Sequence, residues 1–247
     1  MIILMNNKII LLLFILSTSF YFLYRYATEI DVFTIDTNKP GPTILMIGGT
    51  HGNEPAGSLW IEYFIKNTPP IKCGKIILVP RLNKIGLLLS RRHVFHNLIY
   101  RDLNRNYPIK DGEEGKDLIN KKIVKFIKQS DFIIDFHEGW GFHLIDNDSM
   151  GSGLYPSDTK LSISITNELL KNMNKTITDP NKHFTVEYIK NSDIKLNTLR
   201  NHANYKKKNY LLVETTGQDD IQPIEVRVNQ NKYITMFILN KLGMVDF

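Results

Sequence analysis

The hydrophobic positions of this chain follow two patterns that alternate along its length. Short apolar runs bounded by glycine, proline or polar residues are typical of buried strands, and they lie at 43–47, 75–79, 131–136 and 210–213. Longer stretches with helical spacing of apolar residues lie at 55–66, 115–129, 158–173 and 223–242. This alternation predicts an α/β sandwich, one sheet covered by helices on both faces. A further strand-like run at 184–189 favours a mixed sheet.

The N-terminal stretch follows neither pattern, because residues 9–24 are almost wholly apolar between Lys8 and Arg25. Such a stretch predicts a signal peptide or a membrane anchor in residues 1–27, ahead of one catalytic domain in residues 28–247. We favour an uncleaved anchor, since the run continues beyond the small residues that a signal peptidase would need. Sixteen helical residues rise about 24 Å, less than the roughly 30 Å hydrocarbon core, so flanking residues would have to contribute. The flanking charges favour a cytosolic N-terminus and a lumenal or extracellular domain; secretion after cleavage is the alternative.

Composition narrows the class of protein without naming a function. With 247 residues and 43% hydrophobic content, the chain can bury one sizeable core, and its single cysteine excludes an intrachain disulfide framework. The formal charge of +6 is spread along the chain, and its compact basic run, 206–208, is better explained as a solvated loop. We therefore expect no nucleic acid as a partner, and the sequence indicates no obligate protein partner.

Candidate chemistry begins where the run 43–47 ends. Two glycines and a threonine lead into His51 and Glu54, and Pro55 then suits the first position of a helix. The pair should therefore lie on a strand-to-helix loop that can direct an imidazole and a carboxylate to one point. A lone His-x-x-Glu is a weak motif, but the strand, glycine turn and helix around it strengthen the prediction of a metal site.

A catalytic zinc usually has three protein ligands and one open position, so a third ligand is needed. His137 is the best candidate, because it follows the run 131–136 and would lie at a neighbouring strand end. His143 would serve only if its loop folds back, and Glu138 should point away from His137 on an extended segment. Asp135 is a candidate for orienting one of the ligands.

Two further groups of residues have the chemistry of a hydrolase site. Asn104 and Arg105, in a segment rich in donors, can hold a carboxylate, although the segment could also be an ordinary polar loop. Glu214 follows the run 210–213, a position that suits a general base. The single thiol, Cys73, has no histidine near it in the sequence, which disfavours covalent catalysis.

The order of these motifs resembles that of the zinc carboxypeptidases. The segment Gly48-Gly49-Thr50-His51-Gly52-Asn53-Glu54 is especially similar to the succinylglutamate desuccinylase and aspartoacylase branch. The resemblance implies a phosphorylase/hydrolase-like fold, Zn²⁺ on His51, Glu54 and His137, a substrate carboxylate on Asn104 and Arg105, and Glu214 as the base. It also implies an arginine that polarises the scissile carbonyl; Arg92 fits the spacing better, and Arg91 is the alternative.

The expected function is therefore a zinc-dependent amide hydrolase acting next to a free carboxylate. A metallocarboxypeptidase that removes C-terminal residues from peptides is favoured, because the short stretch after Glu214 suggests an open cleft. An N-acyl amino acid deacylase is the first alternative, and a catalytically inactive, membrane-tethered binding protein is the second. A proton-donating tyrosine is expected by analogy, with Tyr188, Tyr205 and Tyr210 as candidates.

Overall fold

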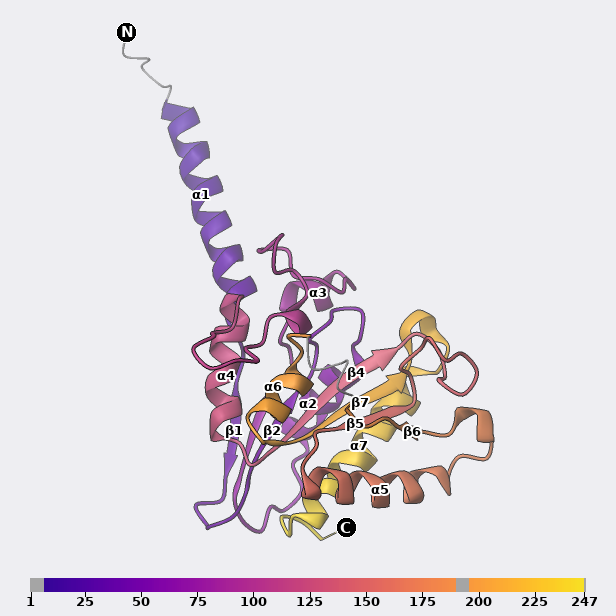
Figure 1. Cartoon of the computed structure of the whole chain (residues 1–247). Helices are drawn as coiled ribbons and strands as arrows, with labels where there is room; N and C mark the ends of the chain where they lie inside the picture. The colour runs from indigo at the N-terminus through magenta and orange to yellow at the C-terminus, as the bar shows by residue number, and fades with distance from the viewer. Residues whose placement is uncertain (1–6, 190–195, 247) are drawn as a thin grey trace.

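The computed structural model describes residues 7–189 and 196–246, and its centre is one mixed sheet (Figure 1). The strand order is β1-β3-β2-β4-β7-β5-β6. The strands are β1 (Phe33–Asp36), β2 (Thr43–Ile47), β3 (Lys75–Val79), β4 (Phe132–Gly139), β5 (Gly153–Pro156), β6 (Thr185–Val186) and β7 (Asn209–Thr216). The four central strands β3, β2, β4 and β7 are parallel, whereas β1 pairs antiparallel with β3 and β5 pairs antiparallel with β7 and parallel with β6. The predicted mixed sheet is therefore confirmed.

Helices cover both faces of the sheet, as the sequence pattern predicts. They are α1 (Asn7–Thr28), α2 (Ala56–Lys66), α3 (Lys84–Leu88), α4 (Leu118–Gln129), α5 (Lys160–Asn174), α6 (Leu199–Tyr205) and α7 (Ile224–Lys241). Helices α2, α5 and α7 pack on one face, against side chains such as Ile44 and Met46 of β2. Helices α4 and α6 pack on the other face, against Leu45 and Ile47. Because alternate residues of β2 enter opposite cores, residues 44–47 are all apolar.

Two strands extend beyond their apolar runs. The apolar run 131–136 leads into His137, and β4 continues to Gly139, because every residue from Phe132 to Gly139 pairs with β7. Glu214 likewise lies within β7 rather than after it. In contrast, only Thr185 and Val186 of the predicted strand 184–189 pair, with β5.

Helix α1 projects away from the sandwich and is longer than its apolar run (Figure 1). Its 22 residues rise about 33 Å, which removes the shortfall expected from the apolar run alone. Residues Ile9–Thr28 are long and apolar enough to cross a membrane, and none of residues 9–26 is buried against the rest of the described chain. At its lower end, Lys122 of α4 donates to the Thr28 carbonyl (2.9 Å) and pairs with Glu29 (3.0 Å).

Candidate active site

The site lies where three neighbouring parallel strands end. Strand β4 lies between β2 and β7, so the carboxyl ends of all three meet at one edge of the sheet. His51 and Glu54 follow β2, and His137 on β4 is paired in register with Glu214 on β7. In open α/β sheets this edge is the usual place for a ligand site.

The loop after β2 is shaped by glycines. Gly49 has a φ of +64°, a left-handed conformation that side-chain-bearing residues rarely adopt. Gly52 packs so closely on the following segment that an added Cβ would lie 1.9 Å from the Gly86 carbonyl carbon. Its backbone N–H donates to the Arg91 carbonyl (3.1 Å), which ties the loop to the segment after α3. Helix α2 then begins at Ala56, so Pro55 immediately precedes the helix and does not occupy the predicted first helical position.

Three side chains converge on one point and form the candidate metal centre. Glu54 places Oε1 at 2.8 Å from His51 Nδ1 and Oε2 at 2.8 Å from His137 Nδ1. The two Nδ1 atoms are 3.1 Å apart, and all three residues are buried. Two imidazole nitrogens and a carboxylate form a donor set that suits Zn²⁺, so these residues fit the metal that the motifs imply.

The second nitrogen of each imidazole faces a carboxylate. His51 Nε2 lies 3.1 Å from Asp102 Oδ1, and His137 Nε2 lies 3.3 Å from Asp135 Oδ1. Tyr210 donates to the other oxygen of Asp135 (2.8 Å) and so fixes that carboxylate. A carboxylate at Nε2 favours the tautomer that leaves Nδ1 free for a metal, and it raises the basicity of the ligand.

The electrostatics of Asp102 agree with this role. Burial works to raise the pKa of Asp102, but the hydrogen bond and charge of His51 and the charge of Arg92 hold that pKa well below its usual range. Asp102 therefore stays ionised at neutral pH. No local sequence pattern predicts this role for Asp102, since its contact with His51 spans 51 residues of chain.

Glu214 is buried at the cleft, next to the candidate metal centre. Burial raises its pKa to about 8, with further increases from the charges of Glu54 and Asp135 and opposing effects from His137 and Arg92. A carboxyl with a pKa near neutrality can both accept and return a proton.

Arg92, rather than Arg91, lines the cleft. Its Nη1 lies 3.2 Å from Glu54 Oε1, and its Nη2 lies 3.2 Å from Asp102 Oδ2. The backbone is held by Asn83, which donates to the Arg92 carbonyl (3.2 Å). The guanidinium therefore lies beside the candidate metal centre.

Asn104 and Arg105 also line this cleft, which has a volume of about 440 Å³. Asn104 Oδ1 accepts from the backbone N–H of Leu199 (2.9 Å), so its Nδ2 is the side of the amide left for a ligand. The exposed Arg105 donates from Nη1 to the Asn104 carbonyl (2.8 Å). The cleft thus brings together the predicted ligand loop, Arg92, Asn104, Arg105 and Glu214.

Several cleft residues were not predicted, because they come from α6, β5 and the segments beside them. Arg200 of α6 lies 5.4 Å from the ring of Tyr155 and donates to the Pro156 carbonyl (3.1 Å). Tyr155 of β5 lines the cleft and donates to the Met150 carbonyl (3.0 Å). The three tyrosines considered from the sequence are not cleft-lining residues; they are Tyr188, Tyr205 and Tyr210.

The rival metal ligands are engaged elsewhere. Glu138 accepts from the Ala56 N–H at the start of α2 (2.6 Å) and pairs with the buried Arg227. Its side chain thus points away from His137, as expected for adjacent residues of a strand. His143 Nδ1 lies 2.8 Å from the Ser149 carbonyl oxygen, with which it shares a hydrogen bond.

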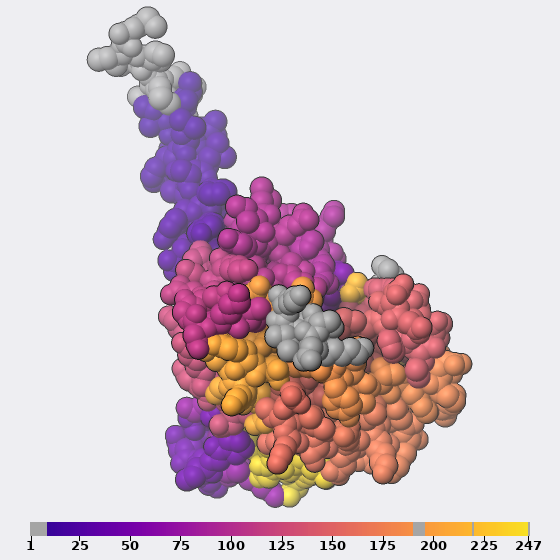
Figure 2. Space-filling model, viewed as in Figure 1, coloured from indigo at the N-terminus to yellow at the C-terminus, as the bar shows by residue number. Residues whose placement is uncertain are grey.

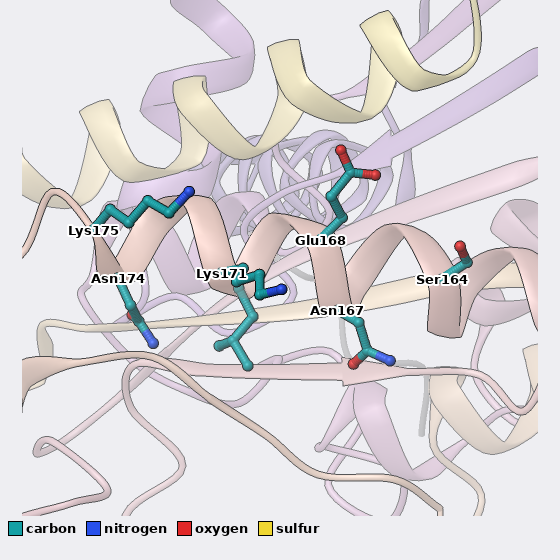
Figure 3. Close-up of a pocket in the computed structure, with 7 residues that line it drawn as sticks. Ser164, Asn167, Glu168, Lys171, Asn174 and Lys175 are labelled. Carbon is teal, nitrogen blue, oxygen red and sulfur yellow. The ribbon is translucent and has the colours of Figure 1, made fainter.

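A larger hollow, of about 820 Å³, lies along α5 and contains none of these residues (Figure 3). It is lined by polar side chains of one helix, including Asn167, Glu168 and Lys171. A hollow along one helix offers no converging groups for catalysis, so the cleft at the strand ends is the candidate site.

Comparison with known proteins supports the resemblance that the motifs imply. Residues 40–141 match the family described as the succinylglutamate desuccinylase/aspartoacylase catalytic domain. A search of curated protein sequences gives no match.

Solved structures share the fold. The product-bound cell shape determinant protein Csd4 from Helicobacter pylori is 19% identical, with a TM-score of 0.73 over 89% of this chain and 57% of that chain. The mDAP-bound form of Csd4, described as a D,L-carboxypeptidase, has a TM-score of 0.70 at 19% identity over 86% of this chain and 55% of that chain. A succinylglutamate desuccinylase/aspartoacylase from Rhodobacter sphaeroides is 16% identical, with a TM-score of 0.63 over 89% of this chain and 60% of that chain. This chain thus spans less than two thirds of each of these relatives.

Proposed function

We propose that this chain is a zinc-dependent hydrolase that cleaves an amide bond next to a free carboxylate, and that it acts as a carboxypeptidase on peptides. The observation that carries this proposal is the convergence of two imidazoles and a carboxylate beside Glu214 and Arg92 in one cleft. A catalytically inactive binding protein is not favoured, because every side-chain type that the reaction requires is present there.

The proposed division of labour follows from the position of each group. A zinc ion held by His51, Glu54 and His137 would supply Lewis acidity and lower the pKa of a water molecule to about 7. Glu214 would take the proton of the attacking water and later deliver it to the leaving nitrogen. Arg92 would stabilise the negative charge that develops on the carbonyl oxygen. Asp102 and Asp135 would keep the imidazoles in the required tautomer.

We assign recognition of the substrate carboxylate to Asn104 and Arg105, which line the same cleft. Arg105 offers a guanidinium and Asn104 an amide, a combination that recognises a carboxylate with directed hydrogen bonds. A peptide C-terminus satisfies this arrangement. An N-acyl amino acid also satisfies it, and the family match of residues 40–141 makes a deacylase the second candidate.

The carboxylate contact gives the first prediction. Amidating the substrate carboxylate should reduce kcat/KM by roughly tenfold or more, since a hydrogen bond to a charged group contributes about 1.5–3 kcal/mol. Arg105→Ala should remove most of the difference between the free acid and the amide. Paired kinetics on one peptide in both forms measure this effect.

Arg101→Ala is the matched control, because Arg101 is exposed in the same segment and does not line the cleft. It should retain the full preference for the free acid. Equal turnover of acid and amide by the parent enzyme would exclude both the carboxypeptidase and the deacylase, and would leave an endo-acting amidase.

We also propose that α1 is an uncleaved membrane anchor, with the N-terminus cytosolic and the catalytic domain lumenal or extracellular. Support comes from the exposed apolar surface of α1 and its length. The end of the helix is also built into the domain, since Ala27 and Thr28 are buried and Thr28 is held by Lys122. A signal sequence has the same composition, so secretion after cleavage is the competing arrangement.

A further inference from the structure

A second apolar surface is formed by the end of α3 and the segment that follows it. Its exposed side chains include Leu88, Leu89, Phe95, Leu98 and Ile99. Leu98 and Ile99 are 85% and 83% exposed, higher values than those of the exposed apolar side chains of α1. Five largely exposed apolar side chains within twelve residues of chain mark a candidate interaction surface.

The segment is held in a fixed conformation by its own hydrogen bonds. Asn97 Oδ1 accepts from the N–H groups of Ile99 (3.2 Å) and Tyr100 (3.0 Å), which closes a turn around Leu98. The amide of Asn97 donates to Asp117 (2.9 Å), and His96 Nε2 lies 3.0 Å from the same carboxylate. Asp117 also caps the start of α4. The two apolar side chains at the tip are therefore presented outward from an anchored turn.

This surface adjoins the lower end of the apolar helix. The ring of His96 lies 6.3 Å from that of Tyr24, and Lys84 of α3 lies 4.8 Å from the ring of Tyr26. Figures 1 and 2 show α3 and the segment after it beside the base of α1. Tyrosines at the end of an apolar helix typically lie at the level of the lipid head groups. The turn around Leu98 therefore lies close to the level of the lipid head groups.

The charge of the segment itself fits a membrane with anionic lipids, and the neighbouring carboxylates Asp31 and Asp117 are paired with Lys84 and His96. No acidic residue occurs in the sequence between Glu62 and Asp102, and the exposed Arg91 lies within the apolar segment. Basic groups near an anionic membrane surface add electrostatic attraction.

We infer that residues 88–99 form a second membrane contact, which inserts into the interfacial layer of the bilayer that α1 spans. This inference rests on the proposed anchor. It has a structural consequence for the cleft, because the same segment carries Arg92 and the carbonyl of Arg91 that holds Gly52. Two contacts, α1 and this segment, would fix the direction in which the cleft faces relative to the membrane.

The test is a depth measurement on the full chain in lipid nanodiscs. Spin labels are attached singly to Leu98→Cys, Ile99→Cys, Leu12→Cys or Ile145→Cys, each in a Cys73→Ser background. Leu12 lies within α1 and serves as the bilayer reference, whereas Ile145, an exposed isoleucine between β4 and β5, serves as the aqueous control. The inference predicts that labels at 98 and 99, like the label at 12, are more accessible to oxygen than to a water-soluble nickel chelate, with the reverse at 145.

Each other outcome overturns the inference in a distinguishable way. Aqueous labels at 98 and 99 with a bilayer signal at 12 would reject the second contact and leave the anchor in place. An aqueous label at 12 would reject the anchor and the second contact together. Dipolar broadening at 98 that disappears on dilution with unlabelled chain would assign the surface to a second copy of the protein. None of these readouts depends on catalysis, so the proposed activity is tested separately.

Discussion

Glu214→Gln is expected to reduce kcat by roughly 10²–10⁴-fold, the usual contribution of a positioned general base. The amide has almost the same shape as the carboxyl but cannot accept the proton of the attacking water. The backbone of Glu214 is paired in register with that of His137, one of the candidate ligands, and the substitution does not alter this backbone pairing. The loss of activity should therefore arise from the missing proton transfer, since the side chain at position 214 stays in place. Steady-state kinetics measure kcat, and metal analysis of the same preparation measures the zinc content.

The control for this variant is Glu168→Gln, which changes an exposed carboxylate of α5 away from the cleft. It should leave kcat unchanged. Glu214→Gln should also keep its zinc and its affinity for substrate. A general base contributes at least about 10²-fold to kcat. A kcat of Glu214→Gln within about threefold of the parent value would therefore show that Glu214 is not the base.

His137→Ala and His51→Ala should each lose stoichiometric zinc, because a site with three protein ligands retains little affinity with two. The fold should persist in both variants, since the two hydrophobic cores on either face of the sheet do not depend on these side chains. Elemental analysis after dialysis measures the metal, and circular dichroism verifies the fold.

His143→Ala is the matched control for the ligand variants. His143 lies six residues after His137, but its Nδ1 is engaged with the Ser149 carbonyl. It should therefore keep one zinc per chain. Folded His51→Ala and His137→Ala proteins that still bind one zinc per chain would show that the ligand assignment is wrong.

The central sheet was predictable because its parallel strands are buried on both faces. Continuous apolar runs such as 43–47 are identified as strands by their short length and by the glycine, proline and polar residues that bound them, and the polar residues that follow them mark the functional edge. Asp135 was also a candidate for orienting a ligand, and it lies beside His137 Nε2.

Other parts of the cleft gave no such signal. Strand β5 has four residues and α6 has seven, too few for a period to stand out, although they supply Tyr155 and Arg200. The contact between Asp102 and His51 depends on how the segment 88–102 folds back, and no local pattern encodes that path. Strand β4 continues beyond its apolar run to Gly139, because pairing with β7 outweighs the polarity of His137 and Glu138.

The most direct test of the proposed function is metal-dependent turnover by the full chain. The zinc-loaded protein, the chelator-stripped protein and the stripped protein with zinc restored are incubated with free-acid peptides and N-acyl amino acids, and newly formed amino groups are quantified. We expect product from the loaded and restored samples only, with peptides preferred over N-acyl amino acids. Turnover that is unchanged by stripping, or no turnover of either substrate class by the loaded protein, would contradict the proposed zinc-dependent hydrolase.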